Sequence, residues 1–459
     1  MDEPRNPAGT GSASILDGNS FKVSDAAALP PRERELVERR GELLGPAYRL
    51  FYRHPVEIVR GRGARVWDAD GVEYLDCYNN VASIGHAHPA VVEAVHAQLA
   101  QLNTHTRYLH AAILDYAQEL LGTMPGAGGD RIDQVMFVNS GSEANDLALR
   151  VGREYTRGRA WIATSEGYHG NTALVSAHSP SLAGSEAMDP ALRIVEPPDT
   201  YRADSSAAAG SAFLTGVAAA IAEIESSDDG LAGIILDTSF SSDGIYFGAR
   251  GMIAAAIDLV HAHGGVVIAD EVQPGFGRTG EAFWGFERHG VAPDIVTLGK
   301  PMGNGYPVAA MAARREVLEP FASRRPYFNT FGGSPVAMAA ARAVLDTIRA
   351  ERLQEHALTT GAALRVALAG LAERHDAIGD VRGAGLYTGL ELVADRATKA
   401  PASDLALRVL EELRERRVLT SVCGPTNSVL KLRPPLAFSE TDIQRLVEAL
   451  DGALIAASR

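Results

Sequence analysis

Two charged residues follow apolar segments that have the composition of β-strands. Asp270 closes the run Val266-Val267-Ile268-Ala269-Asp270, and Lys300 lies just after the apolar residues 295–298. A lysine amine can form a Schiff base with an aldehyde. A carboxylate can hold the proton on a pyridine nitrogen, which makes the ring an electron sink. The pair therefore indicates a site for pyridoxal 5′-phosphate (PLP), which has both an aldehyde and a pyridine nitrogen.

A third segment, NSGSEAN (139–145), has the form of a phosphate cradle. The apolar residues before it predict a strand, and the periodic residues after it predict a helix, with Ser140, Gly141 and Ser142 in the tight turn between them. The free amides of a helix's first turn attract a phosphate dianion. Ser140 and Glu143 also have the Ser-x-x-Glu spacing of a capping box, which closes a helix start without any ligand. Both interpretations can hold together.

Composition sets limits on the class of protein. The 459 residues are 46% hydrophobic, which is enough to bury a core in more than one small domain. The formal net charge of −14 argues against a nucleic-acid surface, which needs a basic patch, so we expect no nucleic-acid partner. This charge is compatible with a cationic substrate, although plain solubility explains it as well. Two cysteines, Cys77 and Cys423, imply no disulfide framework.

No stretch approaches the roughly 20 continuous apolar residues that cross a bilayer, and no basic-then-apolar signal sequence opens the chain. We therefore expect no membrane partner and a cytoplasmic location. His86 and His88 flank one alanine, as do His261 and His263, but neither pair has the Cys or carboxylate set of a metal site. We expect no metal.

The order of the predicted elements indicates an α/β fold. Short apolar strands alternate with helices, which favours a mixed, mostly parallel sheet with helices on both faces. The Ala/Ser/Asp-rich stretches 203–212 and 226–230 predict surface loops instead. The strands are predicted at 134–138, 160–164, 233–236, 265–269 and 295–298.

The chain divides into four parts. Residues 1–30 lack apolar periodicity and predict a mobile tail. Residues 31–75 begin with a helix, continue as an alternating hairpin, and predict an N-terminal segment that packs with the small domain. Residues 76–335 predict the large, PLP-binding domain. Residues 336–459 open with a long Ala-rich helix and predict the smaller α+β domain.

Five motifs, taken in order, resemble the class III aminotransferases, which are fold type I PLP enzymes. The resemblance runs from about residue 52 to about residue 439, nearly the whole chain. It implies a large, mostly parallel sheet of the seven-stranded type, a smaller C-terminal α+β domain, and a homodimer with shared active sites. The motifs are SGSEAN (140–145), GYHG (167–170), DEVQPGFGRTG (270–280), LGKPMGNGYP (298–307) and NTFGGSPVA (329–337).

The resemblance assigns the catalytic roles to Lys300 and Asp270. Lys300 matches the Schiff-base lysine, which also moves the proton between the substrate carbon and the cofactor, and Asp270 matches the partner of the pyridine nitrogen. Each residue also has a plain structural reading, for example Asp270 as a helix cap. The remaining cofactor residues that the resemblance implies are Ser140, Gly141 and Ser142 at the phosphate, Tyr168 with His169 on one ring face, Val272 and Gln273 behind the ring, and Thr330 from the neighbouring subunit.

Two positions depart from the family pattern. Many members have arginine in Arg-x-x-Pro-Pro, where it forks onto the oxo-acid carboxylate. Here that position is Lys431, a point charge and no fork, with Arg433 nearby but out of register. Asp237 stands where the family commonly has the glutamate that pairs with the arginine. These departures resemble a subgroup that includes phospho-lyases of amino alcohols or hydroxylysine and aminotransferases from aminoglycoside antibiotic pathways.

The resemblance thus implies a PLP-dependent aminotransferase that moves an amino group between a primary amine and an oxo acceptor. We expect the amine to be an amino sugar or another cationic or phosphorylated amine. Phosphate elimination from a phosphorylated amine is the alternative reaction, and epimerisation is a minor one. A non-catalytic binding role is disfavoured by the presence of Lys300. The side chains expected at the substrate are Tyr52, Asn79, Arg107, Tyr108 and Lys431.

Overall fold

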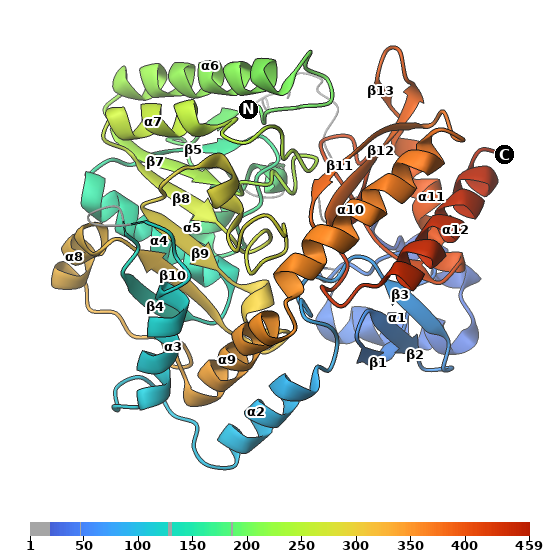
Figure 1. Cartoon of the computed structure of the whole chain (residues 1–459), viewed down its shortest axis with the longest axis horizontal. Coiled ribbons are helices and arrows are strands. Elements are labelled where there is room, and N and C mark those ends of the chain that lie inside the picture. Colours follow the sequence, from blue (N-terminus) through green and yellow to red (C-terminus); the bar gives the residue numbers. More distant parts are fainter. Residues whose placement is uncertain (1–18, 46, 127–130, 185–186) are drawn as a thin grey trace, which may run out of the picture.

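The computed structural model describes residues 19–45, 47–126, 131–184 and 187–459. Figure 1 shows a large sheet covered by helices, beside a smaller domain in which both ends of the described chain meet. The described residues form a seven-stranded sheet in the large domain, with a five-stranded and a four-stranded sheet beside it.

The seven-stranded sheet positions the site. Its order is β4-β10-β9-β8-β7-β5-β6, and β10 is the strand that runs antiparallel to its neighbours. Since the other neighbouring pairs are parallel, the carboxyl ends of these strands share one edge. The bounds are β4 Gln134–Val138, β5 Ala160–Thr164, β6 Arg193–Val195, β7 Leu231–Leu236, β8 Val266–Asp270, β9 Ile295–Leu298 and β10 Ala309–Ala313.

Helices cover both faces of this sheet, as an interior of continuous apolar strands requires. Helix α4 (Gly141–Thr156) packs on one face together with α8 (Arg315–Arg324). Helix α6 (Ser206–Glu225) packs on the other face with α7 (Ala254–Ala262). The two faces have separate clusters of buried side chains, because successive residues of a strand point to opposite sides.

The stretch 203–212, predicted as a surface loop, is mostly helix, because α6 begins at Ser206 with Ser205 as its N-cap. Its alanines favour helix, and Phe213, Val217 and Ile221 bury one face against the sheet. In the described chain α6 is also the one helix long and apolar enough to span a membrane by length and composition. Its packed position in the fold accounts for that composition.

The smaller domain is built from both ends of the chain. Its C-terminal sheet has the order β11-β12-β16-β15, and β3 of the N-terminal hairpin pairs in parallel with β14. The N-terminal segment therefore lies against the C-terminal domain. The strands are β1 Ile58–Arg62, β2 Arg65–Asp68, β3 Glu73–Asp76, β11 Ile378–Ala384, β12 Tyr387–Asp395, β13 Ala400–Pro401, β14 Val418–Leu419, β15 Val422–Cys423 and β16 Val429–Leu432.

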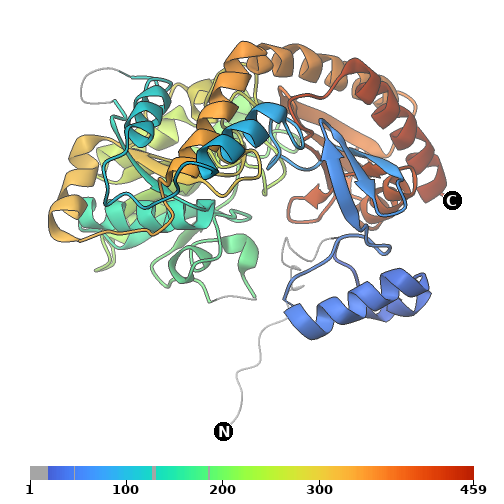
Figure 2. The same cartoon turned by 90° about the horizontal axis from the view of Figure 1, so that it is seen from below.

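Helices complete both domains. Helix α9 leads out of the large domain and lies along α2, and α10 continues beside β11. Seen from below, α1 lies apart from the body, with no buried residue of its own (Figure 2). The bounds are α1 Pro31–Leu44, α2 Pro89–Leu99, α3 Ala111–Leu121, α5 Ala173–Ser176, α9 Pro335–Ala350, α10 Leu353–Ala372, α11 Ser403–Glu415 and α12 Glu440–Ala457.

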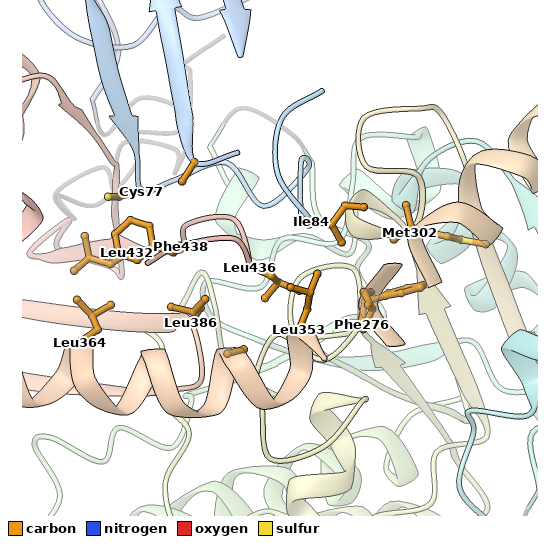
Figure 3. Packing of buried hydrophobic residues seen from close by; sticks show 14 of the residues in the cluster. Cys77, Ile84, Phe276, Met302, Leu353, Leu364, Leu386, Leu432, Leu436 and Phe438 are labelled. Atoms are coloured by element: carbon orange, nitrogen blue, oxygen red, sulfur yellow. The ribbon is translucent and has the colours of Figure 1, made fainter. Parts of the chain in front are cut away.

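A buried cluster joins the two domains at the site's edge. Figure 3 shows Phe276 and Met302 of the large domain beside Leu353 of α10, with Leu436 and Phe438 from the chain after β16. All five side chains are at most 5% exposed. Burial of apolar surface stabilises the folded state by about 25 cal/mol per Å². The segment that follows Lys300 is therefore held against both domains.

Most of the tail predicted over 1–30, residues 1–18, lies outside the described residues. The structure differs from the prediction for residues 19–30, which include the 3-10 helix η1 (Val23–Ala28). Asn19 is 8% exposed and its Oδ1 accepts a hydrogen bond from Ser421. The Phe21 N–H donates to the Leu50 carbonyl at 2.8 Å. This part of the chain therefore packs against both ends of the small domain.

Candidate active site

The strand ends bring the predicted catalytic pair to one cavity. Asp270 is the last residue of β8, and Lys300 begins the 3-10 helix η5 (Lys300–Gly303) after β9. Both line a cavity of about 400 Å³. The predicted residues that also line it are Ser140, Gly141, Ser142, Tyr168, His169, Val272 and Gln273.

Lys300 has the electrostatics of a reactive amine. Burial, followed by the nearby Arg433 guanidinium, lowers the pKa of Lys300 to about 8. Asp270 and Asp237 oppose this shift without cancelling it. A lysine that loses its proton near neutral pH is a competent nucleophile toward an aldehyde.

Asp270 is held in a fixed orientation. It is 4% exposed, and its Oδ2 lies 2.8 Å from Nδ1 of His169 and 2.9 Å from Nδ2 of Asn145. Its Oδ1 accepts from the Val272 N–H at 3.1 Å. Asn145 also donates to the His169 carbonyl at 2.7 Å, so the two neighbours brace each other. Asn145 closes the SGSEAN motif but was not among the residues predicted for the site.

The turn before α4 is both a capping box and an open cradle. The Ser140 hydroxyl accepts from the Glu143 N–H at 3.2 Å, and Glu143 accepts from the Asn139 N–H at 2.8 Å. Within the described chain, no hydrogen bond takes the N–H groups of Gly141 and Ser142, which stay available at the positive end of the helix dipole. Both interpretations of this motif therefore describe the same turn.

Glycines leave room at this cradle. A Cβ on Gly141 would lie 3.0 Å from Cγ2 of Val272. At Gly170, where φ is +142°, a Cβ would lie 2.6 Å from the Ser142 hydroxyl. The turn before α4 therefore lies so close to Val272 and to the segment after Tyr168 that only glycine fits at Gly141 and Gly170. These segments enclose the cavity, which has the free amides of the cradle and the carboxylate of Asp270 in its wall.

These residues fit PLP. The cradle amides would hold its phosphate, Asp270 its pyridine nitrogen, and Lys300 its aldehyde, while Val272 and the half-buried Tyr168 flank the space for the ring. The buried Nε2 of His169 has no hydrogen-bond partner among the described residues.

Tyr52 and Asn79 line a neighbouring cavity of about 440 Å³, not the one with Lys300. The Tyr52 hydroxyl donates to the Thr420 carbonyl at 2.6 Å, which fixes it in the wall. Tyr78 borders both regions. It lines the second cavity, stacks under Arg433 at 5.0 Å, and contributes, after burial, to raising the pKa of Tyr168.

Arg107, Tyr108 and Thr330 lie outside both cavities. All three are exposed; Arg107 stacks over Phe328 at 4.4 Å, and Tyr108 stacks on His105 at 5.1 Å. In this chain, therefore, Arg107 and Tyr108 do not approach Lys300. The expectation that they line the substrate entrance is not met within one subunit.

Lys431 is 5% exposed, and its Nζ donates to the Ser241 carbonyl at 2.9 Å. Burial, then Arg433, lowers the pKa of Lys431 to about 7. Arg433 itself is 4% exposed and donates to Oε1 of Gln273 and to the Tyr78 carbonyl. The residue set aside as out of register thus reaches a side chain of the catalytic cavity. Residues two apart on a strand share a face, so the spacing of Lys431 and Arg433 was the signal in the sequence that could have placed Arg433 near the site.

Asp237, at the family's glutamate position, is committed to its own loop. Its carboxylate accepts from the backbone N–H groups of Ser239 at 2.9 Å and Ser241 at 3.2 Å. Burial raises the pKa of Asp237, and these hydrogen bonds and Lys431 act against the shift. It forms no ion pair within the described chain.

Comparisons with known proteins agree with this site. The sequence model of the class III aminotransferases matches residues 51–454. The ethanolamine-phosphate phospho-lyase homolog 1 of Caenorhabditis elegans is 37% identical over 96% of this chain and 98% of its own. An alanine–glyoxylate aminotransferase 2-like protein of Drosophila melanogaster is 40% identical over 88% of this chain and 84% of its own.

Among solved structures, a phospholyase from Arthrobacter in complex with phosphoethanolamine superposes with a TM-score of 0.88. It is 39% identical and covers 92% of this chain and 99% of that one. The fold expected from the motifs, a large sheet domain with a smaller α+β domain, is confirmed by this match and by the strand order. The chain belongs to the class III aminotransferases, enzymes of fold type I that use pyridoxal 5′-phosphate.

Proposed function

We propose that this enzyme eliminates phosphate from a phosphorylated primary amine, with phosphoethanolamine as the model substrate. One observation carries the proposal: among the described residues, the buried cations Arg278, Lys431 and Arg433 form no ion pair with a carboxylate. The relatives named as phospho-lyases support it, since they match nearly the full length of the chain.

The cations are Arg278, Lys431 and Arg433, which are 0%, 5% and 4% exposed. Arg278 donates to the carbonyls of Leu386 and Pro434, and the other two donate to carbonyl oxygens and to an amide. None of these three forms an ion pair within the described chain. Their mutual repulsion shows in the pKa values, because Arg433 lowers those of Arg278 and Lys431.

Burial and Arg433 lower the pKa of Lys431, and Asp237 opposes this shift without offsetting it. Burial and Arg433 likewise lower the pKa of Arg278, and Asp76 opposes that shift without offsetting it. A buried charge that forms no ion pair is costly unless a ligand supplies the opposite sign. A phosphate dianion offers two negative charges, whereas a carboxylate offers one. The cofactor phosphate belongs at the cradle of Gly141 and Ser142, on a different element. The cations near Lys431 are therefore best matched to a phosphate on the substrate.

Transamination is the second candidate, because an aminotransferase 2-like relative is 40% identical. It requires the site to accept an oxo acid, usually through a bidentate arginine. Lys431 presents a single ammonium held by Ser241, and Asp237 is occupied by its own loop. These two residues favour elimination over amino transfer.

When bound, PLP supplies an aldehyde for the amine and an electron sink for the carbon next to it. The residues then divide the work. Asp270, braced by His169 and Asn145, holds the proton on the pyridine nitrogen. Lys300 removes the proton from the carbon that bears the substrate amine, which its pKa of about 8 permits near neutral pH.

The leaving group departs from the neighbouring carbon. The C–O bond breaks, its electron pair leaves with the phosphate, and Lys431 and Arg433 stabilise the charge that develops there. The carbon skeleton is left as an enamine, which water converts to an aldehyde and ammonia. Phosphoethanolamine and water thus give phosphate, acetaldehyde and ammonia, without any oxo acid and without net oxidation.

We also propose that the enzyme works as a homodimer. Thr330 is exposed, and its neighbours in the chain Phe328 and Phe331 are 45% and 68% exposed. Large apolar side chains exposed close together are typical of an interface. A two-fold dimer through this surface would bring Thr330 to the partner's cradle.

The test of the proposed reaction is a matched pair of amines. Phosphoethanolamine and ethanolamine differ only in the phosphate, and alanine with an oxo acid serves as the transamination reference. We expect kcat/KM for phosphoethanolamine to exceed the other two by at least about 100-fold, since truncated substrates lose remote binding energy. A preference for alanine with an oxo acid would reverse the assignment.

A further inference from the structure

A buried ion cluster joins the two domains at a distance from the cavity residues. Glu391, in β12, is 1% exposed, and its carboxylate lies 2.7 Å from Arg382 of β11 and 2.5 Å from Arg202. Arg202 belongs to the large domain, between β6 and α6. We call Arg202, Arg382 and Glu391 the interdomain ion cluster. Each arginine also pairs with a carboxylate of its own segment, Arg382 with Asp380 at 2.9 Å and Arg202 with Asp199 at 3.1 Å. Glu391 is the buried carboxylate that the two arginines share, so the cluster links the two domains through it.

Arg382 also holds a strained turn of the large domain. Its Nε donates to the carbonyls of Gly244 at 3.0 Å and Ile245 at 2.9 Å, and its guanidinium stacks over Tyr246 at 4.7 Å. Ile245 has a φ of +66°, which is unusual for a β-branched residue. Such a conformation persists only where the surroundings over-determine it. The bonds to the carbonyls before and after this φ supply that restraint.

The same loop, residues 237–247, reaches the substrate side of the site. The Ser241 carbonyl accepts from Lys431, and the Ser242 carbonyl accepts from the Gly424 N–H at 2.9 Å. The loop is closed internally, because the N–H groups of Gly244 and Ile245 both donate to the Phe240 carbonyl. A shift at Ile245 is therefore transmitted to Ser241 through a few hydrogen-bonded residues.

We infer that the interdomain ion cluster positions Lys431 for the substrate through loop 237–247, with Arg382 as the central positioning residue. In the described chain, the hydrogen-bond and ion-pair partners of Arg382 do not line the catalytic cavity, so Arg382 acts on the site through other residues. The inference concerns the placement of a substrate-side cation and goes beyond the proposed reaction. It holds for phosphate elimination and for transamination alike.

Two substitutions separate positioning from general stability. Arg382→Lys keeps the positive charge but cannot reach the Gly244 and Ile245 carbonyls and Glu391 together. Glu391→Gln keeps the shape and removes the charge that both arginines share. The matched control is Arg396→Lys, because Arg396 also bridges backbone carbonyls, those of Ile378 and His375, but within the small domain alone.

The first measurement is hydrogen exchange of the holoenzyme by mass spectrometry. We expect peptides that cover 237–247 to exchange faster in Arg382→Lys and Glu391→Gln than in wild type, and unchanged in Arg396→Lys. This readout does not depend on which reaction the enzyme performs. Unchanged exchange of 237–247 in both test variants would overturn the inference.

The second measurement is a double-mutant cycle with Lys431→Met, using whichever amine the wild-type holoenzyme turns over. We expect Arg382→Lys to raise KM by about tenfold and to leave the cofactor's visible band intact, because a small misplacement of Lys431 weakens substrate binding without touching the cofactor. In the Lys431→Met background the same change should add little, because coupled residues are not additive. Equal effects in both backgrounds would show that Arg382 acts on stability alone. A wild type that releases no phosphate would count against the proposed reaction and leave both readouts usable.

Discussion

Lys300 and Asp270 act as a pair because their surroundings treat them differently. Lys300 lies beside Arg433 in a partly buried position that favours the neutral amine. Asp270 is held by His169, Asn145 and the Val272 backbone N–H, which fix the orientation of its carboxylate. A lysine that loses its proton easily and a carboxylate in a fixed orientation are two properties that PLP chemistry requires.

The lowered pKa of Lys300 predicts how the apoenzyme captures PLP. Capture needs the neutral amine, whose fraction rises with pH through about 8. The capture rate, followed by the growth of the visible band, should therefore be slow at acidic pH, half-maximal near pH 8 and constant above it. Lys300→Ala should show no such band at any pH. A midpoint close to that of an ordinary lysine would contradict the environment described for Lys300.

Asp270→Asn tests the electron-sink role with almost no change of shape. The amide can still accept from Val272 but cannot hold a proton on the pyridine nitrogen by charge. We expect kcat at saturating cofactor to fall by about 100-fold or more, with the midpoint of thermal unfolding little changed. Near-wild-type kcat would remove Asp270 from the mechanism.

At this scale the motifs name residues that the structure brings to one cavity, because these stand next to a strand end or a helix start, whereas Thr330 lies outside it. Arg433 was missed, since the family register directed attention to Lys431. Of the two, Arg433 contacts Gln273 of the catalytic cavity, whereas Lys431 donates to the Ser241 carbonyl. Arg107 lies outside the cavity of this chain, and its expected place at the substrate stays a prediction.

At the scale of elements, the cradle depends on how closely α4 approaches the loops after β8 and β9. A Cβ on Gly299 would lie 3.3 Å from the Gly141 nitrogen, and one on Gly141 would lie 3.0 Å from Val272. The glycines thus set the depth of the phosphate site. At the start of α4, the Ser140 hydroxyl accepts from the Glu143 N–H and the Glu143 carboxylate accepts from the Asn139 N–H. The N–H groups of Gly141 and Ser142 are the ones left for a phosphate.

Gly141→Ala should therefore weaken cofactor binding. The added methyl group must displace Val272 or the helix start, and we expect the PLP dissociation constant to rise by about tenfold, in the range of overpacking costs. Gly370→Ala is the control, because its Cβ would meet nothing within 4 Å in the helix α10. That change should be neutral or stabilise by about 0.5–1 kcal/mol. Equal cofactor affinity in the two variants would contradict the cradle.

The strands predicted from apolar runs coincide with β4, β5, β7, β8 and β9 to within two residues at each end. Strand β10 was missed because Ala309–Ala313 is nearly all alanine, which has low strand propensity. Pairing with β4 and β9 inside the sheet overrides that preference. Helix α6 was missed for the opposite reason, since its Ser- and Ala-rich start resembles a linker.

At the scale of the whole molecule, the site depends on residues far apart in the sequence. Arg278 of the large domain reaches the carbonyls of Leu386 and Pro434 in the small domain. Strand β3 pairs with β14, although more than half of the chain lies between them in the sequence. Local sequence patterns do not predict a pairing of this kind. The division into a large and a small domain could be predicted from the order of elements, but the contacts between them could not.

The proposed dimer makes a prediction about mixed chains. In a dimer of one Lys300→Ala chain and one Thr330→Ala chain, the two substitutions fall in the same site if Thr330 serves its partner. The other site is then wild type at both positions. We expect such heterodimers to recover about half of the wild-type activity per dimer, as a two-fold arrangement of shared sites requires. Activity no higher than that of the two parent homodimers would place Thr330 in its own subunit's site.

The most direct test of the account is to give the holoenzyme phosphoethanolamine alone and count the phosphate released per active site. A transaminase without an oxo acid stops once its cofactor carries the amino group, after a single turnover. We expect continued phosphate release over many turnovers, with acetaldehyde and ammonia formed in equal amounts and no increase in rate on adding an oxo acid. Consumption that stops at one equivalent, with no phosphate released, would contradict it.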